Sequence, residues 1–384
     1  MTSDPGRPAA PLRRVILIPD SFKGTLSSTE ICQAMASVLA VHQPQAELVA
    51  LPVADGGEGS VDAFLAAVGG ERVPVRVTGP FPGEQVEGFY GRLDGGTAVV
   101  EMAAAAGLPL AEGRLAPALT TTYGVGELIL AAARDGARRL VIGAGGSATT
   151  DLGTGAAAAV GVVFHDADGK PFVPTGATLD RITAIDTSGI DPRVRACELT
   201  VMCDIDNPLY GPRGAAHVFG PQKGADPAMV AFLDDQLRAG AAAIRRELGV
   251  DIAEVPGAGA AGGLAGGLLA FLGATLRQGI DVVLDATGFD DLVAGADLVL
   301  TGEGRIDSQS LSGKVVVGVA RRASRHGVPV IAVVGQAGEG YEGVFDLGVT
   351  RVEATSPPGR PFSQARLTAR EDLVATLERL AATL

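Results

Sequence analysis

The feature that most constrains this chain is a unit that recurs along it: a short apolar run, a turn rich in Gly and Asp, and a helix-like stretch rich in Ala and Leu. Its first copy runs from Val15–Pro19 through Asp20–Gly24 to a helix that begins near Ser28. Ser27 and Glu30 have the spacing of a capping box at the start of that helix. Apolar strands that alternate with helices predict a parallel sheet covered on both faces.

Further copies of the unit predict further strands of the same kind. Their apolar runs are Leu48–Val53, Leu140–Ile142 and Asp297–Leu300. Val330–Val334 predicts one more buried strand, and Glu371–Leu384 predicts a closing helix. In Val349–Ala354 apolar and polar residues alternate, which predicts a strand nearer the edge of the sheet.

The middle of the chain follows a different pattern. From about Glu71 to Val100, apolar runs lie between Gly and Pro turns with little helix, which favours antiparallel or mixed sheet. We therefore predict an α/β protein of two domains. A discontinuous parallel-sheet domain of the Rossmann or flavodoxin-like type would comprise residues 15–75 and 290–384, with a mixed-sheet α/β domain inserted at residues 76–289. Residues 1–14 are predicted to be a disordered lead-in.

Composition and charge exclude several classes of protein. With 31 Lys and Arg against 44 Asp and Glu, the net charge is −13, so neither a nucleic acid nor a membrane is an expected partner. Cys32, Cys197 and Cys203 are scattered and form no C-x-x-C pair, as expected of a protein from the reducing cytoplasm. Residues 255–276 carry no charge, but 13 of these 22 are Gly or Ala, which favours a close-packed buried helix over a membrane span.

Two polar turns follow the first two predicted strands, where ligands of open α/β sheets bind. In the first, Asp20, Ser21 and Lys23 offer a carboxylate, a hydroxyl and an ammonium ahead of a helix N-terminus, a place that favours anions. The alternative is that Asp20 caps a turn and Lys23 lies in solvent. In the second, Asp55-Gly56-Gly57-Glu58-Gly59 brings carboxylates and exposed N–H groups to one rim, and a plain glycine turn is the alternative.

The third polar turn is the one most typical of a phosphate site. Between Gly143 and Asp151, successive small residues allow backbone amides to wrap a phosphate, with three hydroxyls and one carboxylate to assist. The residues concerned are Gly145, Gly146, Ser147, Thr149, Thr150 and Asp151. A purely structural turn is the alternative.

The fourth polar turn is a dense mixture of charges after the strand predicted at Asp297–Leu300. Glu303, Arg305, Asp307 and Lys314 lie within 12 residues of one another. Carboxylates are metal ligands, and Arg and Lys bind anions, so this turn predicts both kinds of contact. A solvated charged loop is the alternative.

A fifth polar turn carries Asp204 and Asn207 after a strand predicted at Leu199–Met202, and it offers oxygen ligands to Mg²⁺ or to a polar substrate. A surface Asx turn is the alternative. The four histidines show no metal-ligand spacing, which favours oxygen-bound Mg²⁺ over Zn²⁺. No Walker A sequence is present, and Gly257–Gly262 matches G-x-G-x-x-G without a preceding strand, as expected of a helix-packing run. The five turns together suggest Mg²⁺-assisted phosphoryl chemistry on a small polar substrate.

Six segments of the chain, in order, resemble the bacterial glycerate kinase family, the group without a P-loop that phosphorylates D-glycerate with ATP. The segments are Ile18–Gly24, Ala54–Gly59, Gly145–Asp151, Cys203–Leu209, Phe219–Ala225 and Thr301–Asp307 continuing to Lys314. Each is weakly specific alone, but six at similar spacing over almost the whole chain are a strong match. The resemblance implies a two-domain α/β protein with its active site in the cleft between the domains. It also implies ATP and Mg²⁺ as cofactors, with 2-phosphoglycerate favoured over 3-phosphoglycerate as the product.

The resemblance also implies roles for the polar residues. Asp20, Lys23 and Asp204 would be catalytic, with Asp204 as the base or a Mg²⁺ ligand and Lys23 countering phosphate or carboxylate charge. Metal contacts would come from Asp151, Glu303 and Asp307. Substrate and phosphate contacts would come from Ser21, Asp55, Gly56, Gly57, Gly145, Gly146, Ser147, Thr149, Thr150, Asn207, Arg305 and Lys314.

Two other functions fit the sequence less well. A NAD-dependent 2-hydroxy-acid dehydrogenase would use Gly257–Gly262 for NAD and would need a catalytic His near a strand end, which the four histidines hardly support. A non-enzymatic hydroxy-acid sensor would need the substrate contacts but not the surplus of carboxylates. The sequence leaves open whether the protein is a monomer or a homo-oligomer.

Overall fold

The computed structural model describes residues 11–53, 59–312, 314–357 and 359–384. Contacts within the chain divide it into two compact units, residues 1–55 with 280–384, and residues 56–279. The joins fall at 55/56 and 279/280, compared with 75/76 and 289/290 in the sequence analysis. Of the lead-in expected at residues 1–14, the first ten residues lie outside the described part of the chain, and strand β1 begins at Arg14.

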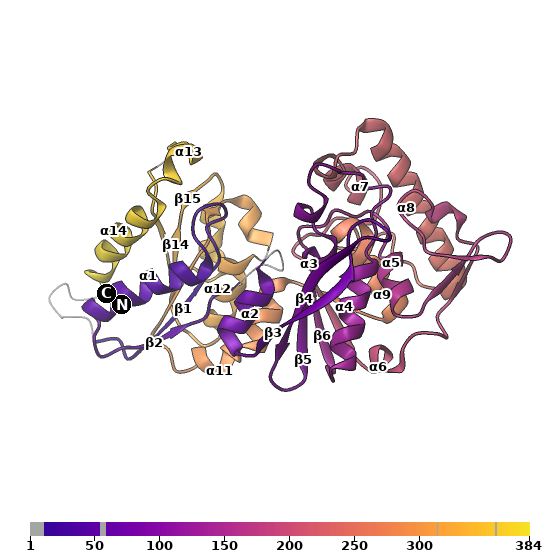
Figure 1. The fold of residues 1–384 in the computed structure, drawn as a ribbon. Helices are drawn as coiled ribbons and strands as arrows, with labels where there is room; N and C mark the ends of the chain where they lie inside the picture. The colour runs from indigo at the N-terminus through magenta and orange to yellow at the C-terminus, as the bar shows by residue number, and fades with distance from the viewer. Residues whose placement is uncertain (1–10, 54–58, 313, 358) are drawn as a thin grey trace. The chain divides into compact units, whose positions relative to one another are not determined.

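The first unit contains a five-stranded parallel sheet, as the recurring strand–helix unit predicted (Figure 1). Its spatial order is β16 (Arg351–Ala354), β14 (Val330–Val334), β12 (Leu298–Gly302), β1 (Arg14–Pro19) and β2 (Glu47–Ala50). Read from β2, the order of these strands along the chain is 2-1-3-4-5, which is the flavodoxin-like arrangement. The order reverses between β1 and β12, so the carboxyl ends of these two strands flank the switch point where such sheets bind ligands.

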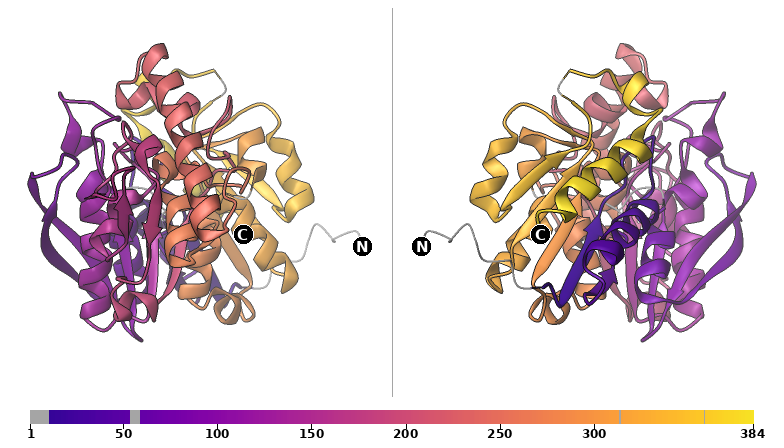
Figure 2. Two further views of the ribbon diagram at one scale, coloured as in Figure 1. Left: turned by 90° about the vertical axis from the view of Figure 1, so that its right-hand side faces the viewer. Right: turned by 90° about the vertical axis from the view of Figure 1, so that its left-hand side faces the viewer.

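Helices cover both faces of this sheet. Helices α1 (Ser28–His42) and α14 (Ala369–Ala381) pack side by side over one face (Figure 2). Their buried residues share an apolar cluster with Val15 and Leu17 of β1. Helix α12 (Val315–Arg325) packs against β12 and β14. The capping box predicted for α1 is confirmed, because the Ser27 side chain accepts from Glu30 N and the Glu30 carboxylate accepts from Ser27 N.

Shorter elements complete the first unit. They are α10 (Gly279–Ala286), which starts at the last residue of the second unit, α11 (Phe289–Val293), α13 (Phe362–Ala365), the 3₁₀ helices η5 (Ser308–Ser312) and η6 (Tyr341–Leu347), and the paired strands β13 (Arg305–Ile306) and β15 (Gln336–Ala337).

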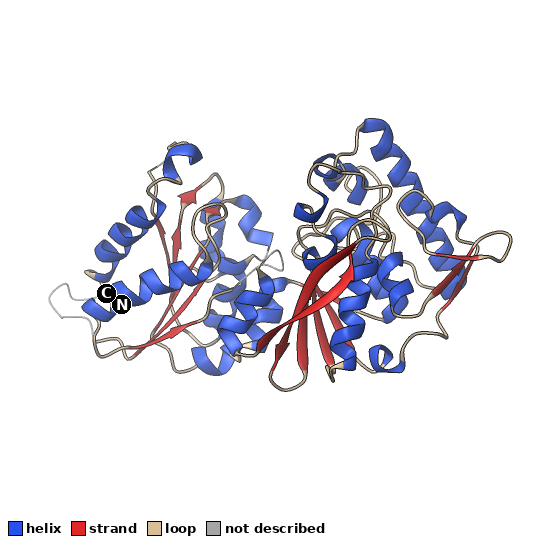
Figure 3. Ribbon diagram, viewed as in Figure 1, coloured by secondary structure: helices blue, strands red, loops and turns tan. Residues whose placement is uncertain are grey.

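The second unit contains a six-stranded mixed sheet, whose strands are red in Figure 3 like all strands of the chain. Its order is β11 (Thr275–Arg277), β10 (Glu198–Met202), β6 (Arg139–Gly143), β5 (Thr97–Glu101), β4 (Gln85–Leu93) and β3 (Glu71–Thr78). The first four strands are parallel to one another, and the β5–β4 and β4–β3 pairings are antiparallel, which confirms the mixed sheet predicted for this part of the chain. A small antiparallel sheet consists of β8 (Pro171–Phe172), β7 (Val163–His165) and β9 (Ala184–Asp186).

The helices of the second unit surround one large apolar core. They are α2 (Ser60–Val68), α3 (Ala103–Ala106), α4 (Tyr123–Arg134), α5 (Thr154–Ala159), α6 (Pro192–Arg195), α7 (Ala215–Phe219), α8 (Pro227–Leu248), α9 (Leu264–Leu272), and the 3₁₀ helices η1 (Pro109–Ala111), η2 (Leu179–Arg181), η3 (Pro221–Lys223) and η4 (Ala260–Gly263).

The uncharged segment 255–276 is not one helix, and that part of the sequence analysis was wrong. It contains η4, α9 and β11, because Ala261, Gly262 and Gly263 adopt positive φ and break the helical path. A Cβ on Gly262 would lie 2.0 Å from Thr149 O, so this glycine permits a close approach of two backbones rather than a dinucleotide turn. Within the described ranges, no helix is long and apolar enough to cross a membrane.

Candidate active site

Loops from four adjacent strands of the first unit line one cavity at the carboxyl edge of the sheet. The loops follow β1, β12, β14 and β16, and the cavity has a volume of about 420 Å³. Six of the predicted site residues line it: Asp20, Ser21, Lys23, Glu303, Arg305 and Lys314. Sequence reasoning placed them together because the carboxyl ends of parallel strands meet at one edge.

Glycines allow these loops to pack backbone against backbone. A Cβ on Gly302 would lie 2.0 Å from Val333 O, and one on Gly335 would lie 2.3 Å from Gly304 O. Asp20 N also donates to Gly302 O at 2.8 Å, which joins the loop after β1 to the end of β12. The charged side chains at this edge of the sheet are therefore attached to loops whose backbones are closely packed.

Glu303 is the most buried carboxylate of this cavity, with 6% of its surface exposed. Burial raises the pKa of Glu303, and the hydrogen bond from Ser310 together with the charges of Lys314 and Lys23 partly offsets that rise. Among the described residues, Glu303 Oε1 has no hydrogen-bond partner. A buried carboxylate oxygen without a partner is suited to accept a hydrogen bond from a ligand or to coordinate a metal ion.

Sequence reasoning missed the far side of the cavity. Gln336, Thr355 and Ser356 follow β14 and β16, and Phe362 lies in α13. Ser356 is also 6% exposed, and its Oγ finds no partner within the described part of the chain. These loops carry no charge cluster, so the available signal was only their position after predicted strands.

Asp307 lies beside this cavity rather than on its lining. Its carboxylate accepts from Arg305 Nε at 3.0 Å and from Gln309 N at 3.0 Å. Asp20 and Glu303 are the acidic pair whose surroundings fit a magnesium ion, since both line the cavity and Glu303 Oε1 has no partner among the residues that the structure describes. No group of three or more His, Cys, Asp and Glu side chains gathers as a metal site in the ranges the structure describes. Mg²⁺ is usually bound through one or two carboxylates plus substrate phosphates, so two acids suffice.

In the second unit, the predicted phosphate loop is mostly buried. Gly146 is exposed and Gly145 is half-buried, whereas Ser147, Thr149 and Thr150 are buried. Among the residues whose contacts the structure gives, Thr149 Oγ1 has no hydrogen-bond partner. Only the start of this loop therefore reaches the surface of the unit.

Asp151 does not fit the predicted role of metal ligand. Its Oδ2 accepts from Thr122 N at 2.7 Å, from Thr122 Oγ1 at 2.8 Å and from Gly155 N at 3.3 Å, while Oδ1 accepts from Gly153 N at 3.1 Å. The residue is fully buried, and burial raises the pKa of its carboxyl group. Both oxygens are occupied inside the protein, so Asp151 fixes the course of the loop.

Lys223 is a buried lysine that belongs to the segment Phe219–Ala225 of the family resemblance, and the sequence predicted no role for it. Its Nζ donates to Ser147 Oγ at 2.7 Å and to Thr149 O at 2.6 Å. Burial lowers the pKa of Lys223 to about 7, and the nearby charge of Asp151 acts in the opposite direction. The amine therefore holds the glycine-rich loop from inside the unit.

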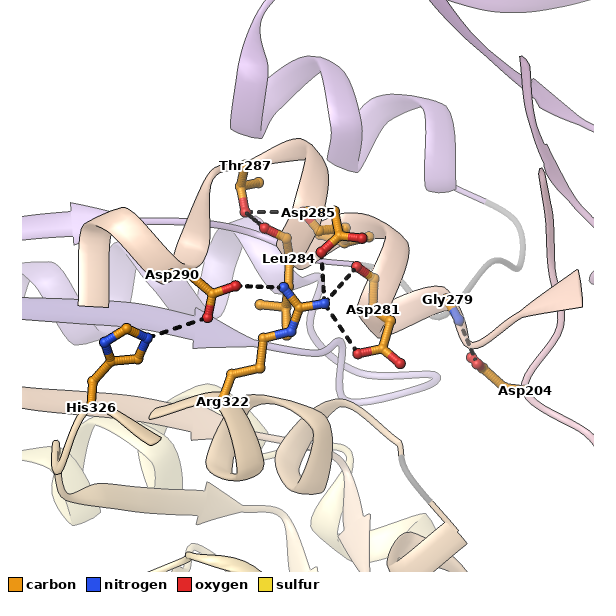
Figure 4. A network of polar contacts seen from close by, with 10 residues as sticks. Asp204, Gly279, Asp281, Leu284, Asp285, Thr287, Asp290, Arg322 and His326 are labelled. Atoms are coloured by element: carbon orange, nitrogen blue, oxygen red, sulfur yellow. Dashed lines mark hydrogen bonds and ion pairs between the residues drawn. The ribbon is translucent and has the colours of Figure 1, made fainter. Parts of the chain in front are cut away.

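The turn after β10 places Asp204 and Asn207 in local hydrogen bonds. Asp204 Oδ1 accepts from Gly279 N at 2.7 Å, as Figure 4 shows, and Asn207 Nδ2 donates to Arg213 O at 2.7 Å. Asp55, Gly56 and Gly57 lie outside the described residues.

Figure 4 also shows an arginine network in the first unit that the sequence analysis did not predict. Arg322 of α12 contacts Asp285 Oδ1 at 2.7 Å and Asp290 Oδ2 at 2.9 Å, and it also contacts Asp281. These ion pairs tie α10 and α11 to α12, whose N-terminal end carries Lys314. The network thereby supports the helix that delivers Lys314 to the cavity.

A flavodoxin-like sheet with lysines and carboxylates around a cavity at its switch point defines an α/β enzyme that binds a charged small molecule. The model of the glycerate kinase family matches residues 15–384. The chain belongs to the glycerate kinase family, and it is accordingly a phosphotransferase.

Individual relatives agree over nearly their full length. A glycerate 2-kinase of Escherichia coli is 44% identical over 97% of this chain and 98% of its own, and a glycerate kinase of Bacillus cereus is 43% identical over 96% and 97%. A crystal structure from Salmonella typhimurium LT2, named as a glycerate kinase 2, has a TM-score of 0.85 and 42% identity over 97% of this chain and 98% of that one.

Proposed function

We propose that this enzyme transfers the γ-phosphoryl group of ATP to D-glycerate with the help of Mg²⁺, and that 2-phosphoglycerate is the main product. The observation that carries the proposal is the cavity in which Lys23 and Lys314 lie with Asp20 and Glu303. Phosphoryl transfer requires positioning and charge neutralisation more than covalent chemistry, and this set of side chains supplies both signs of charge. The relative named as a glycerate 2-kinase supports the 2-position.

In this reaction, each group of charged side chains would have its own role. Lys23 and Lys314 would neutralise phosphate oxygens, and Arg305 would add a further donor at the cavity wall. Asp20 and Glu303 would hold Mg²⁺, which when bound with the nucleotide offsets the charge of its phosphates. Asp204 stays our candidate for the base that accepts the proton of the glycerate hydroxyl. Gly145 and Gly146, at the accessible start of the glycine-rich loop, stay candidates for substrate or phosphate contacts.

The test is an assay of the purified protein with ATP, Mg²⁺ and D-glycerate, in which release of ADP is measured and the product is identified by ³¹P NMR. The proposal predicts ADP release that depends on glycerate and a resonance of 2-phosphoglycerate. A 3-phosphoglycerate signal would overturn the regiochemistry alone. Binding of glycerate without turnover would indicate a sensor, and turnover with NAD in place of ATP would indicate a dehydrogenase.

A further inference from the structure

The size of the cavity in the first unit distinguishes between the two proposed substrates. Its volume of about 420 Å³ lies within the range of roughly 300–1,000 Å³ that is usual for pockets of drug-sized ligands. Glycerate is a three-carbon acid and would leave most of this space empty. A nucleoside triphosphate is of the size that the cavity can enclose.

The lining is chemically divided along the sheet. The loops after β1 and β12 contribute Lys23 and Glu303, and Lys314 lies with them. Lys314 directly precedes α12, a helix of 11 residues whose N-terminal N–H groups favour a phosphate. This end of the cavity is built for an anion.

The other end, after β14 and β16, is largely uncharged. Gln336, Thr355 and Ser356 line it with side-chain amide and hydroxyl groups. Ser356 N donates to Gly335 O at 3.0 Å, so its backbone is fixed, while its buried Oγ has no partner among the side chains and backbone groups described. An unpaired buried hydroxyl is uncommon and indicates a hydrogen bond that a ligand completes.

An aromatic ring lies at the same wall. Phe362 lines the cavity although 56% of its surface is exposed, and its Cζ would lie 3.2 Å from a Cβ on Gly24, which has a φ of +78°. The ring thus rests against the glycine of the first polar turn. Exposed aromatic faces of this kind stack on nucleobases.

We infer that this cavity binds the whole nucleoside triphosphate, with its phosphates at Lys23 and Lys314 and its nucleoside against Ser356 and Phe362. The inference rests on the proposed function, since it says which of the two substrates of that reaction the cavity receives. Glycerate then takes its main contacts outside the uncharged end. Arg366 and Asp372 also line the wall, and Asp372 is already paired with Arg360 at 2.7 Å.

The test compares two ligands by calorimetry in the presence of Mg²⁺: a non-hydrolysable ATP analogue, and inorganic triphosphate, which lacks the nucleoside. Phe362→Ala should weaken binding of the analogue by about tenfold and leave binding of triphosphate unchanged. Ser356→Ala should act in the same direction with a smaller factor, and it removes only a hydroxyl without a described partner. Lys314→Ala should weaken binding of both ligands.

The matched control is Phe345→Ala, which removes another partly exposed ring of the first unit that does not line the cavity. It should leave both affinities unchanged, and thermal unfolding should show that all variants fold. Unchanged analogue binding in Phe362→Ala and Ser356→Ala, or a rise in the KM for glycerate instead of that for ATP, would overturn the inference. If the wild-type protein binds the analogue as described but does not phosphorylate glycerate, the proposed function fails and the nucleotide site stands.

Discussion

The ammonium group of Lys223 donates to Ser147 Oγ at 2.7 Å, and both side chains are buried. This contact joins the 3₁₀ helix η3 to the glycine-rich loop, although 76 residues separate them in the sequence. Lysine is almost never fully buried without a compensating partner, because burial of its ammonium group costs free energy. The fold accepts this cost at the glycine-rich loop.

The first prediction concerns the pH dependence that Lys223 imparts to stability. Burial lowers the pKa of Lys223 to about 7, while the unfolded chain keeps a value near 10.5. Above pH 7 the unfolded state binds more protons than the native state, so stability from this group increases with pH. Relative to Lys223→Met, the free energy of unfolding of the wild type should rise by roughly 1 kcal/mol between pH 7 and pH 8. Urea unfolding at both pH values measures it, and a constant difference would contradict it.

Asp151→Asn should destabilise the protein rather than alter its metal requirement. The carboxylate accepts four hydrogen bonds, and asparagine would replace one accepting oxygen with an NH₂ group that points its own donors at these N–H and O–H donors. We expect a loss of about 2 kcal/mol in the free energy of unfolding. A stable variant whose activity needs more Mg²⁺ would restore Asp151 as a metal ligand.

Lys23→Ala should reduce kcat/KM by about tenfold or more, because a charge-assisted contact to phosphate contributes roughly 1.5–3 kcal/mol. Lys170→Ala is the control, since Lys170 is exposed at the hairpin between β7 and β8, where its N donates to Asp166 Oδ1. The control should stay within about twofold of the wild type. Equally small losses of kcat/KM in the two variants would show that Lys23 has only a local role in its turn and does not contact phosphate.

Glu303→Gln should lower activity sharply and increase stability at neutral pH. Burial raises the pKa of Glu303, so the native state binds more protons than the unfolded state above the normal value of 4.5. The free energy of unfolding of the wild type therefore falls as the pH rises from 4.5 through the raised pKa of Glu303, and glutamine, which does not ionise, avoids this fall. Thermal unfolding at pH 5 and pH 8 should show a gain for the variant that is larger at pH 8, and an equal or smaller gain at pH 8 would contradict the assignment.

Asp204→Asn should keep the fold and lose most turnover. Asparagine retains an oxygen that can accept from Gly279 N, as Asp204 Oδ1 does at 2.7 Å, but it cannot act as a base. Steady-state kinetics at several Mg²⁺ concentrations measures the effect. Recovery at high Mg²⁺ would make Asp204 a metal ligand, whereas full activity would remove it from the site.

The strands and the charged half of the cavity were predictable because their signals are local. Asp20, Lys23 and Glu303 follow strongly apolar runs, and the parallel sheet that those runs predict brings their ends together. Ser356 and Phe362 were not predictable, because neither belongs to a charged or glycine-rich motif. Asp151 was predicted to be a metal ligand because it is a carboxylate in a glycine-rich turn. Only the fold brings Thr122, which lies 29 residues away in the sequence, to that carboxylate as a hydrogen-bond donor.

The central pairing of the first unit also constrains how the chain can fold during synthesis. β1 lies beside β12 in register from Val15 with Leu298, and Thr301 Oγ1 donates to Ile18 O across 283 residues. β2 can pair with β1 early, but the other edge of β1 stays unpaired until the ribosome has made the whole inserted unit, which has its own apolar core. Nascent chains will complete the inserted unit first, and the apolar β1 segment will meanwhile be a target for chaperones that hold exposed strands.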